Sequence, residues 1–164
     1  MSKTTETNFY KESLKLLTTT KIPFMVGGTY AFNSYIGTDR HTSDLDIFCK
    51  AGDYTKILQI FHDKGYKTQI TDERWIAKVL KGKYRMDLIF NSAIAVTPVS
   101  DEWLKESQVA KIFNTEVKLL PPTELIWSKV FVQIRDKYHG HDIGNPNHLS
   151  TISCPEVKIG NRCL

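Results

Sequence analysis

Apolar and polar positions along the chain change their period several times, and each period predicts one kind of element. Helical spacing, with apolar residues three or four positions apart, predicts helices at residues 5–20, 29–36, 53–64, 100–108 and 123–138. Short apolar or alternating runs predict strands at residues 24–26, 44–49, 66–70, 75–80, 84–90, 109–113 and 116–120. This order of elements predicts an α/β (α+β) fold, in which helices flank a small mixed β-sheet.

Turn-forming residues separate the predicted elements. Gly37 and Gly65 stand where helices should end, and Asp53 is placed to cap the start of a helix. The tripeptide at 81–83 predicts a hairpin turn, and so does the pair at 114–115. The two hairpins would connect neighbouring antiparallel strands of the sheet.

Length and charge narrow the class of protein. A chain of 164 residues is expected to form one domain. The periodic pattern fades near its end, which predicts a domain over residues 1–143 and a tail over residues 144–164. The net charge of +4 suits an anionic ligand, but no basic run is dense enough for a nucleic-acid tail. No segment approaches the roughly 20 apolar residues of a membrane span, so we expect a cytoplasmic protein without a membrane partner.

The cysteines and histidines do not suggest a zinc site. The three cysteines have no zinc spacing, and Cys49 at the end of a strand is expected to be an inert core thiol. His41 and His139 lack ligand spacing and are expected to be solvated. The three tryptophans are expected in the core or at its rim, and the alternative is that one of them flanks a bound nucleobase. They are Trp75, Trp103 and Trp127.

Two carboxylates on one predicted strand suggest a metal site. Asp44 and Asp46 alternate with apolar residues, so both side chains face the same way. Two like charges on a half-buried strand need a cation or hydrogen bonds to offset them, and Mg²⁺ takes oxygen ligands of this kind. The pair Gly27-Gly28 precedes them at a strand-to-helix turn, where backbone N–H groups can bind an anion. A metal site beside a phosphate site indicates nucleotide chemistry.

A third carboxylate, Asp87, lies in the middle of the apolar segment 84–90. If its strand neighbours that of Asp44, three carboxylates can converge on two Mg²⁺ ions about 4 Å apart, with Mn²⁺ as a substitute. Asp87 would then be placed to deprotonate an attacking hydroxyl. The alternative is that Asp87 pairs with Arg85 or Lys83 at a strand edge, and Asp-x-Asp also occurs at solvated strand ends.

Other polar residues are candidates for supporting roles. Lys129 lies on a mostly apolar helix and either reaches a phosphate or extends to solvent. Arg40 precedes the carboxylate pair and either contacts phosphate or pairs with an acid to order the loop. Thr42 is expected to support the same loop through hydrogen bonds.

Several of these residues resemble the DNA polymerase β-like nucleotidyltransferase superfamily, and more narrowly its small bacterial nucleotidyltransferase family proteins. The resemblance covers residues 20–143 and includes the glycine turn, the R-x-T-x-D-L-D pattern at 40–46, Asp87, and the segments 121–129 and 135–142. It implies that the triphosphate is bound by Gly27, Gly28 and Thr29. It also implies that the metals are held by Asp44, Asp46 and Asp87. The family transfers a nucleoside monophosphate from an NTP to an acceptor and releases pyrophosphate.

We therefore expect a Mg²⁺-dependent nucleotidyltransferase of EC 2.7.7 type that acts on an acceptor hydroxyl. The acceptor could be a small molecule such as an antibiotic, a tRNA end or a protein. The chain departs from the family pattern after Asp142, in a region that often shapes the acceptor pocket. Two other functions stay open: a non-catalytic nucleotide- or partner-binding module such as a toxin–antitoxin component, and a metal-dependent nuclease.

Overall fold

A computed structural model of the chain describes residues 3–93 and 95–135, and the elements alternate along it. The helices are α1 (Lys3–Thr19), α2 (Gly28–Ile36), α3 (Tyr54–Asp63), α4 (Asp101–Glu106) and α5 (Pro122–Arg135). The strands are β1 (Phe24–Val26), β2 (Asp44–Cys49), β3 (Lys67–Asp72), β4 (Ile76–Lys81), β5 (Tyr84–Ile89), β6 (Gln108–Ile112) and β7 (Thr115–Leu119). Each predicted element is present, with bounds that differ by at most two residues where both ends are described.

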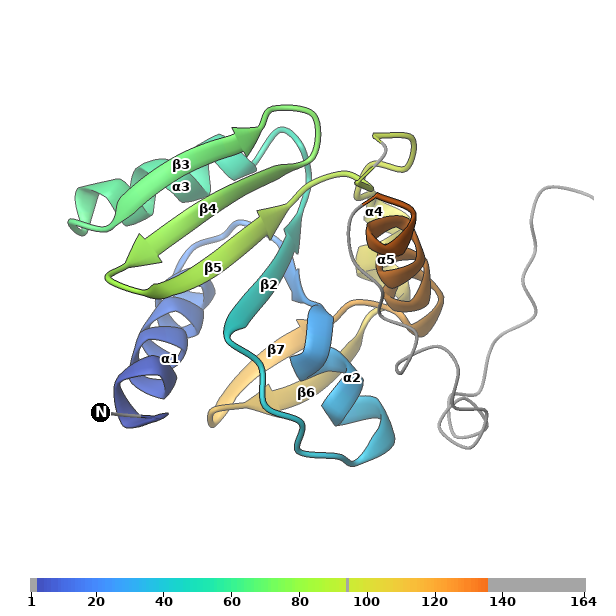
Figure 1. Cartoon of the computed structure of the whole chain (residues 1–164), viewed down its shortest axis with the longest axis horizontal. Coiled ribbons are helices and arrows are strands. Elements are labelled where there is room, and N and C mark those ends of the chain that lie inside the picture. The colour runs from blue at the N-terminus through green and yellow to red at the C-terminus, as the bar shows by residue number, and fades with distance from the viewer. Residues whose placement is uncertain (1–2, 94, 136–164) are drawn as a thin grey trace, which may run out of the picture.

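The strands form one mixed sheet in the order β3-β4-β5-β2-β1-β7-β6 (Figure 1). Two pairs are parallel, β2 with β5 and β1 with β7, and the other neighbours are antiparallel. This arrangement confirms the predicted fold class, a mixed sheet flanked by helices. It also places β2, which carries the Asp-x-Asp pair, in the centre of the sheet.

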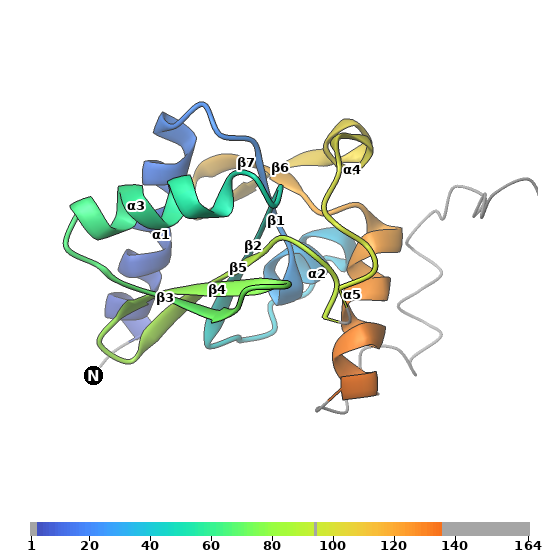
Figure 2. The same ribbon diagram turned by 90° about the horizontal axis from the view of Figure 1, so that it is seen from above.

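Helices cover the two faces of the sheet unevenly. Helices α1 and α3 pack on the face that presents the apolar side chains of β4 and β5, and Lys81 on that face pairs with Glu12 of α1. Helices α2 and α5 pack on each other, and α2 also packs on β2 (Figure 2). The core fills the spaces between these layers and includes Tyr10, Leu14, Phe61 and Met86, all completely buried.

Local sequence signals explain most of the element ends. Gly37 adopts a left-handed conformation with φ 67°, and its N–H donates to the carbonyl of Asn33, which ends α2 as predicted. The expectation for Asp53 was wrong in one respect. It stands at the N-cap position of α3, but its carboxylate pairs with Lys56 instead of capping the helix.

The second hairpin turn lies one residue earlier than predicted. Phe113 and Asn114 both have positive φ, at 50° and 62°, and β7 begins at Thr115. A two-residue turn with positive φ at both central positions matches the twist of the flanking strands. Asparagine at such a position was the usable signal, whereas phenylalanine there is not predictable from preference.

The remaining predictions about buried residues have mixed outcomes. Cys49 is buried, and burial raises the pKa of its thiol to about 12, which confirms an inert thiol. Trp75 and Trp103 are half-buried as expected at a core rim, whereas Trp127 is 46% exposed. The helix end at residue 138, His139 and the tail from residue 144 lie outside the described residues. Within residues 3–93 and 95–135, no helix combines the length and apolar character needed to cross a bilayer.

Candidate active site

The parallel pairing of β2 with β5 brings together residues that are far apart in the sequence. In this register Asp46 lies opposite Asp87, and Asp44 lies opposite Arg85. Residues directly opposite each other on neighbouring strands project from the same face of a sheet. All three predicted carboxylates therefore share one face, and the expectation that the two strands are neighbours is confirmed.

The pKa of Asp46 shows how closely the three carboxylates lie. It is raised from 3.8 to about 7, first by burial and then by the negative charges of Asp44 and Asp87. The positive charges of Lys129 and Arg85 act in the opposite direction. An acid surrounded in this way binds its proton more tightly, and a bound cation would relieve the repulsion.

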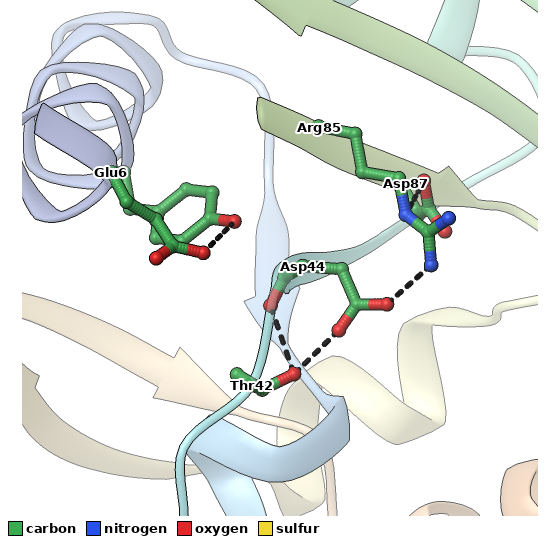
Figure 3. A network of polar contacts seen from close by, with 6 residues as sticks. Glu6, Thr42, Asp44, Arg85 and Asp87 are labelled. Atoms are coloured by element: carbon green, nitrogen blue, oxygen red, sulfur yellow. Dashed lines mark hydrogen bonds and ion pairs between the residues drawn. The ribbon is translucent and has the colours of Figure 1, made fainter. Parts of the chain in front are cut away.

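Arg85 is the part of this cluster that the metal hypothesis did not include. Its guanidinium donates to Asp44 Oδ2 at 2.5 Å, and its Nε lies 3.7 Å from Asp87 Oδ1 (Figure 3). Thr42 supports Asp44 from the other side, where its hydroxyl donates to Oδ1 at 2.5 Å. The alternative pairing of Asp87 with Arg85 is thus present together with the converging carboxylates.

The donor set suits a divalent cation, although Arg85 supplies the counter-charge in the arrangement seen. Within residues 3–93 and 95–135, no three His, Cys, Asp or Glu side chains are arranged as metal ligands. Yet three carboxylates lie side by side on adjacent strands, and the pKa of Asp46 is raised by burial and then by the charges of the other two. Oxygen donors of this kind are what Mg²⁺ and Mn²⁺ prefer.

The glycine turn touches the carboxylate cluster directly. Gly28 has φ 55°, and a Cβ at this position would collide with the carboxylate of Asp46. The N–H of Gly27 donates to the Asp46 carbonyl at 2.9 Å, so this amide is not available for a phosphate. Because the first N–H groups of a helix have no acceptor within it, the available amides are those that open α2, at Gly28 and Thr29.

Two cations flank α2 near this turn. The guanidinium carbon of Arg40 lies 5.7 Å from the centre of the Phe32 ring, and Lys129 Nζ lies 5.9 Å from it. Lys129 belongs to α5, and its charge lowers the pKa of Asp46. Asn33 orders the Arg40 loop, because its side chain binds both the N–H and the carbonyl of Arg40. Lys129 is thus near the carboxylates, as one of its two predicted roles requires.

Sequence reasoning missed a cluster beside Asp44 that comes from α1 and α2. The Tyr10 hydroxyl donates to Glu6 at 3.2 Å, and the ring of Tyr10 packs edge-on against that of Tyr30. The charges of Glu6 and Asp44 add to burial in raising the pKa values of both tyrosines, that of Tyr30 to about 12. His41 is exposed as predicted, and its Nε2 lies 3.6 Å from Glu6 Oε2. Nothing in the periodicity of α1 indicated that its polar residues would approach the site.

Comparison with known proteins identifies the family. Residues 11–95 match the sequence model of a family described as aminoglycoside-2''-adenylyltransferase. The chain belongs to this family. It is therefore a nucleotidyltransferase, an enzyme of EC 2.7.7 type, which confirms the resemblance seen in the sequence. A search of curated proteins finds no match.

Solved structures of antibiotic-modifying proteins show the same fold. The solution structure of the antibiotic-resistance factor ANT(2'')-Ia is 14% identical in sequence and superposes with a TM-score of 0.67. The match covers 92% of this chain and 85% of the ANT(2'')-Ia chain. The crystal structure of ANT(2'')-Ia with adenylyl-2''-tobramycin is 15% identical, with TM-score 0.60 and coverages of 90% and 86%. The lincomycin-bound lincosamide antibiotic adenylyltransferase LnuA is 17% identical, with TM-score 0.61 and coverages of 90% and 96%.

Proposed function

We propose that this enzyme transfers AMP from ATP to a hydroxyl group of a small molecule and requires a divalent metal, Mg²⁺ or Mn²⁺. The observation that carries the proposal is the contact between the two halves of the site. The Gly28 turn abuts Asp46, and Asp46 lies opposite Asp87 on the next strand. A phosphate bound at the start of α2 would therefore lie beside the carboxylates.

Each end of the site has a distinct role in the transfer. The amides of Gly28 and Thr29 would bind the phosphates of ATP, assisted by the cations of Lys129 and Arg40. Asp44, Asp46 and Asp87 would hold the metal, which supplies Lewis-acid stabilisation of the charge that develops on the phosphate oxygens. The small molecule's hydroxyl oxygen forms a bond to the α-phosphorus, and the bond to the β-phosphate oxygen breaks. Pyrophosphate leaves, and Asp87 accepts the proton of the hydroxyl.

The choice of ATP and of a small-molecule acceptor rests on the relatives. One similar structure holds adenylyl-2''-tobramycin, and another is a lincosamide adenylyltransferase bound to lincomycin. Both names describe adenylyl transfer involving antibiotics. The chain shares their fold at low identity, so the acceptor of this enzyme is proposed at the level of a small hydroxyl compound. A tRNA end or a protein acceptor has no comparable support.

A transfer assay tests the proposal. The protein is incubated with Mg²⁺, ATP labelled in the α-phosphate, and a panel of hydroxyl compounds that includes aminoglycosides and lincosamides. We expect labelled product and pyrophosphate with the wild type. The Asp46→Asn and Asp87→Asn variants should lose at least 100-fold in rate, because each removes a metal-holding carboxylate. An Asp63→Asn variant, altered at the end of α3, is the matched control and should keep its rate. Transfer that persists in Asp46→Asn would refute the proposal, as would ATP binding without release of pyrophosphate.

A further inference from the structure

The face that carries the carboxylates continues beyond them onto β4 and β3. The register places Lys78 of β4 opposite Asp87, and Gln69 of β3 opposite Lys78. Together with Asp46 these side chains form one row across four neighbouring strands, and the row ends at the Gly28 turn. Because opposite residues share a face, Lys78 projects on the same side of the sheet as the catalytic carboxylates.

This part of the face is open in the portion of the chain that the structure describes. Helices α1 and α3 pack on the other side of β3, β4 and β5, and the side of β4 away from α3 carries no described helix (Figure 2). Lys67 and Gln69 are exposed, whereas Lys78, Leu80 and Arg85 are half-buried. The side chain of Lys78 makes no hydrogen bond or ion pair with another described residue. An ammonium group carries three donors, so that of Lys78 can bind an anionic group of a ligand.

The geometry of phosphoryl transfer indicates which end of this row faces the leaving group and which faces the acceptor. The attacking oxygen and the leaving group must lie in line on opposite sides of the phosphorus. If pyrophosphate leaves toward the amides at the start of α2, the acceptor must approach from the opposite end, over β5 and β4. Lys78 of β4 stands at that end, opposite Asp87, and Arg85 lies in the neighbouring row, two residues before Asp87 on β5.

We propose that Lys78 binds the acceptor and selects one that carries an anionic group, a phosphate or carboxylate, close to the accepting hydroxyl. This inference rests on the proposed function and adds the chemical class of its acceptor. Lys78 would supply the charge-assisted hydrogen bond to the anionic group, whereas the charge of Arg85 is directed to Asp44 and Asp87. Lys78 would repel a polycationic acceptor such as an aminoglycoside. The acceptor of this enzyme would therefore differ from the aminoglycoside that the family's description names.

Binding to the intact protein tests this without turnover. The protein is saturated with Mg²⁺ and a non-hydrolysable ATP analogue, and calorimetry then measures the affinity for glucose 6-phosphate, glucose and glucosamine. We expect measurable binding of glucose 6-phosphate, and affinities at least tenfold weaker for glucose and glucosamine. The Lys78→Gln variant should lose at least tenfold in affinity for glucose 6-phosphate while its affinity for the ATP analogue is unchanged. The Lys78→Arg variant should retain most of the binding, because it keeps the charge.

The controls separate this inference from the proposed function. Lys111→Gln removes an exposed lysine on β6, at the opposite edge of the sheet, and should leave every affinity unchanged. Three outcomes overturn the role of Lys78: no binding of glucose 6-phosphate by the wild type, equal binding by Lys78→Gln, or weaker binding of the ATP analogue in Lys78→Gln. In the last case Lys78 contacts the nucleotide. If the wild type does not bind the ATP analogue, the proposed function itself is refuted.

Discussion

Gly28 shows how a single residue joins the two halves of the site. Its positive φ is a conformation that L side chains rarely adopt, and the space where a Cβ would stand is filled by the Asp46 carboxylate. The absence of a side chain therefore serves two purposes here. It allows the turn into α2, and it lets the first amides of the helix approach the carboxylates.

Replacing Gly28 by alanine should damage both stability and nucleotide binding. Gly82, in the β4–β5 hairpin, offers a matched control because it also has positive φ, at 60°, but open space around its Cβ position. We expect Gly82→Ala to cost about 1 kcal/mol in the free energy of unfolding, from backbone strain alone. Gly28→Ala should cost at least about 1 kcal/mol more and should also weaken binding of an ATP analogue. Equal effects of the two substitutions in urea unfolding would show that Gly28 does not contact the site.

Asp46 makes the stability of the metal-free protein depend on pH. Its pKa is about 7 in the folded protein and 3.8 when unperturbed, so the folded state binds the proton more tightly. Its contribution to stability is therefore complete below about pH 4 and is lost as the pH rises through about 7. With chelator present, Asp46→Asn should remove this loss and be more stable than the wild type at pH 8, by about 4 kcal/mol. Urea unfolding at pH 5 and pH 8 measures the difference. A variant that is less stable than the wild type at pH 8 would contradict the assignment.

Helices α2 and α5 pack on each other beside the start of α2, where we propose that phosphate binds. The Tyr35 hydroxyl on α2 donates to the carbonyl of Leu120 at 3.0 Å, just before α5 begins. Arg40 and Lys129 lie 5.7 Å and 5.9 Å from the centre of the Phe32 ring on α2, so the pairing of α5 with α2 determines where Lys129 stands. Lys129 reaches the site only because α5 packs against α2.

The position of α5 leads to a prediction for Lys129. Lys129→Gln should weaken binding of the ATP analogue in the presence of Mg²⁺ by about tenfold, because one phosphate-side cation is lost. Lys111→Gln, which changes an exposed lysine on β6, should have no effect. Calorimetric titration of both variants measures this. An affinity of Lys129→Gln equal to that of the wild type would leave Lys129 with only a packing role on Phe32.

The elements themselves were largely predictable, and the contacts between them were only partly so. The periodicity of α1 and the glycine that ends α2 are local signals, and both helices formed as expected. The carboxylates could be anticipated because strand alternation and the apolar surroundings of Asp87 both indicate a buried acid. Arg85 was considered only as an alternative partner, since register alone decides that it stands opposite Asp44. Lys78 carried no signal in the sequence, because its role depends on which strand lies beside β5.

At the scale of the whole molecule, the sheet divides into a covered half and an open half. Helix α2 packs on β2, and α5 packs on α2, whereas β3 and β4 present half-buried and exposed polar side chains on the carboxylate face. The three carboxylates lie at the boundary between the two halves. A nucleotide held under α2 and an acceptor placed over β4 would meet there, which is the arrangement that in-line transfer requires.

Mn²⁺ binding, followed by electron paramagnetic resonance in the complex with a non-hydrolysable ATP analogue, shows whether the three carboxylates hold a metal. We expect the wild-type complex to bind Mn²⁺ more tightly than the analogue alone does. We also expect Asp44→Asn, Asp46→Asn and Asp87→Asn each to weaken this binding at least tenfold, while Asp63→Asn should not. Undiminished Mn²⁺ binding in Asp87→Asn would contradict the central claim, because it would remove the β5 carboxylate from the metal site.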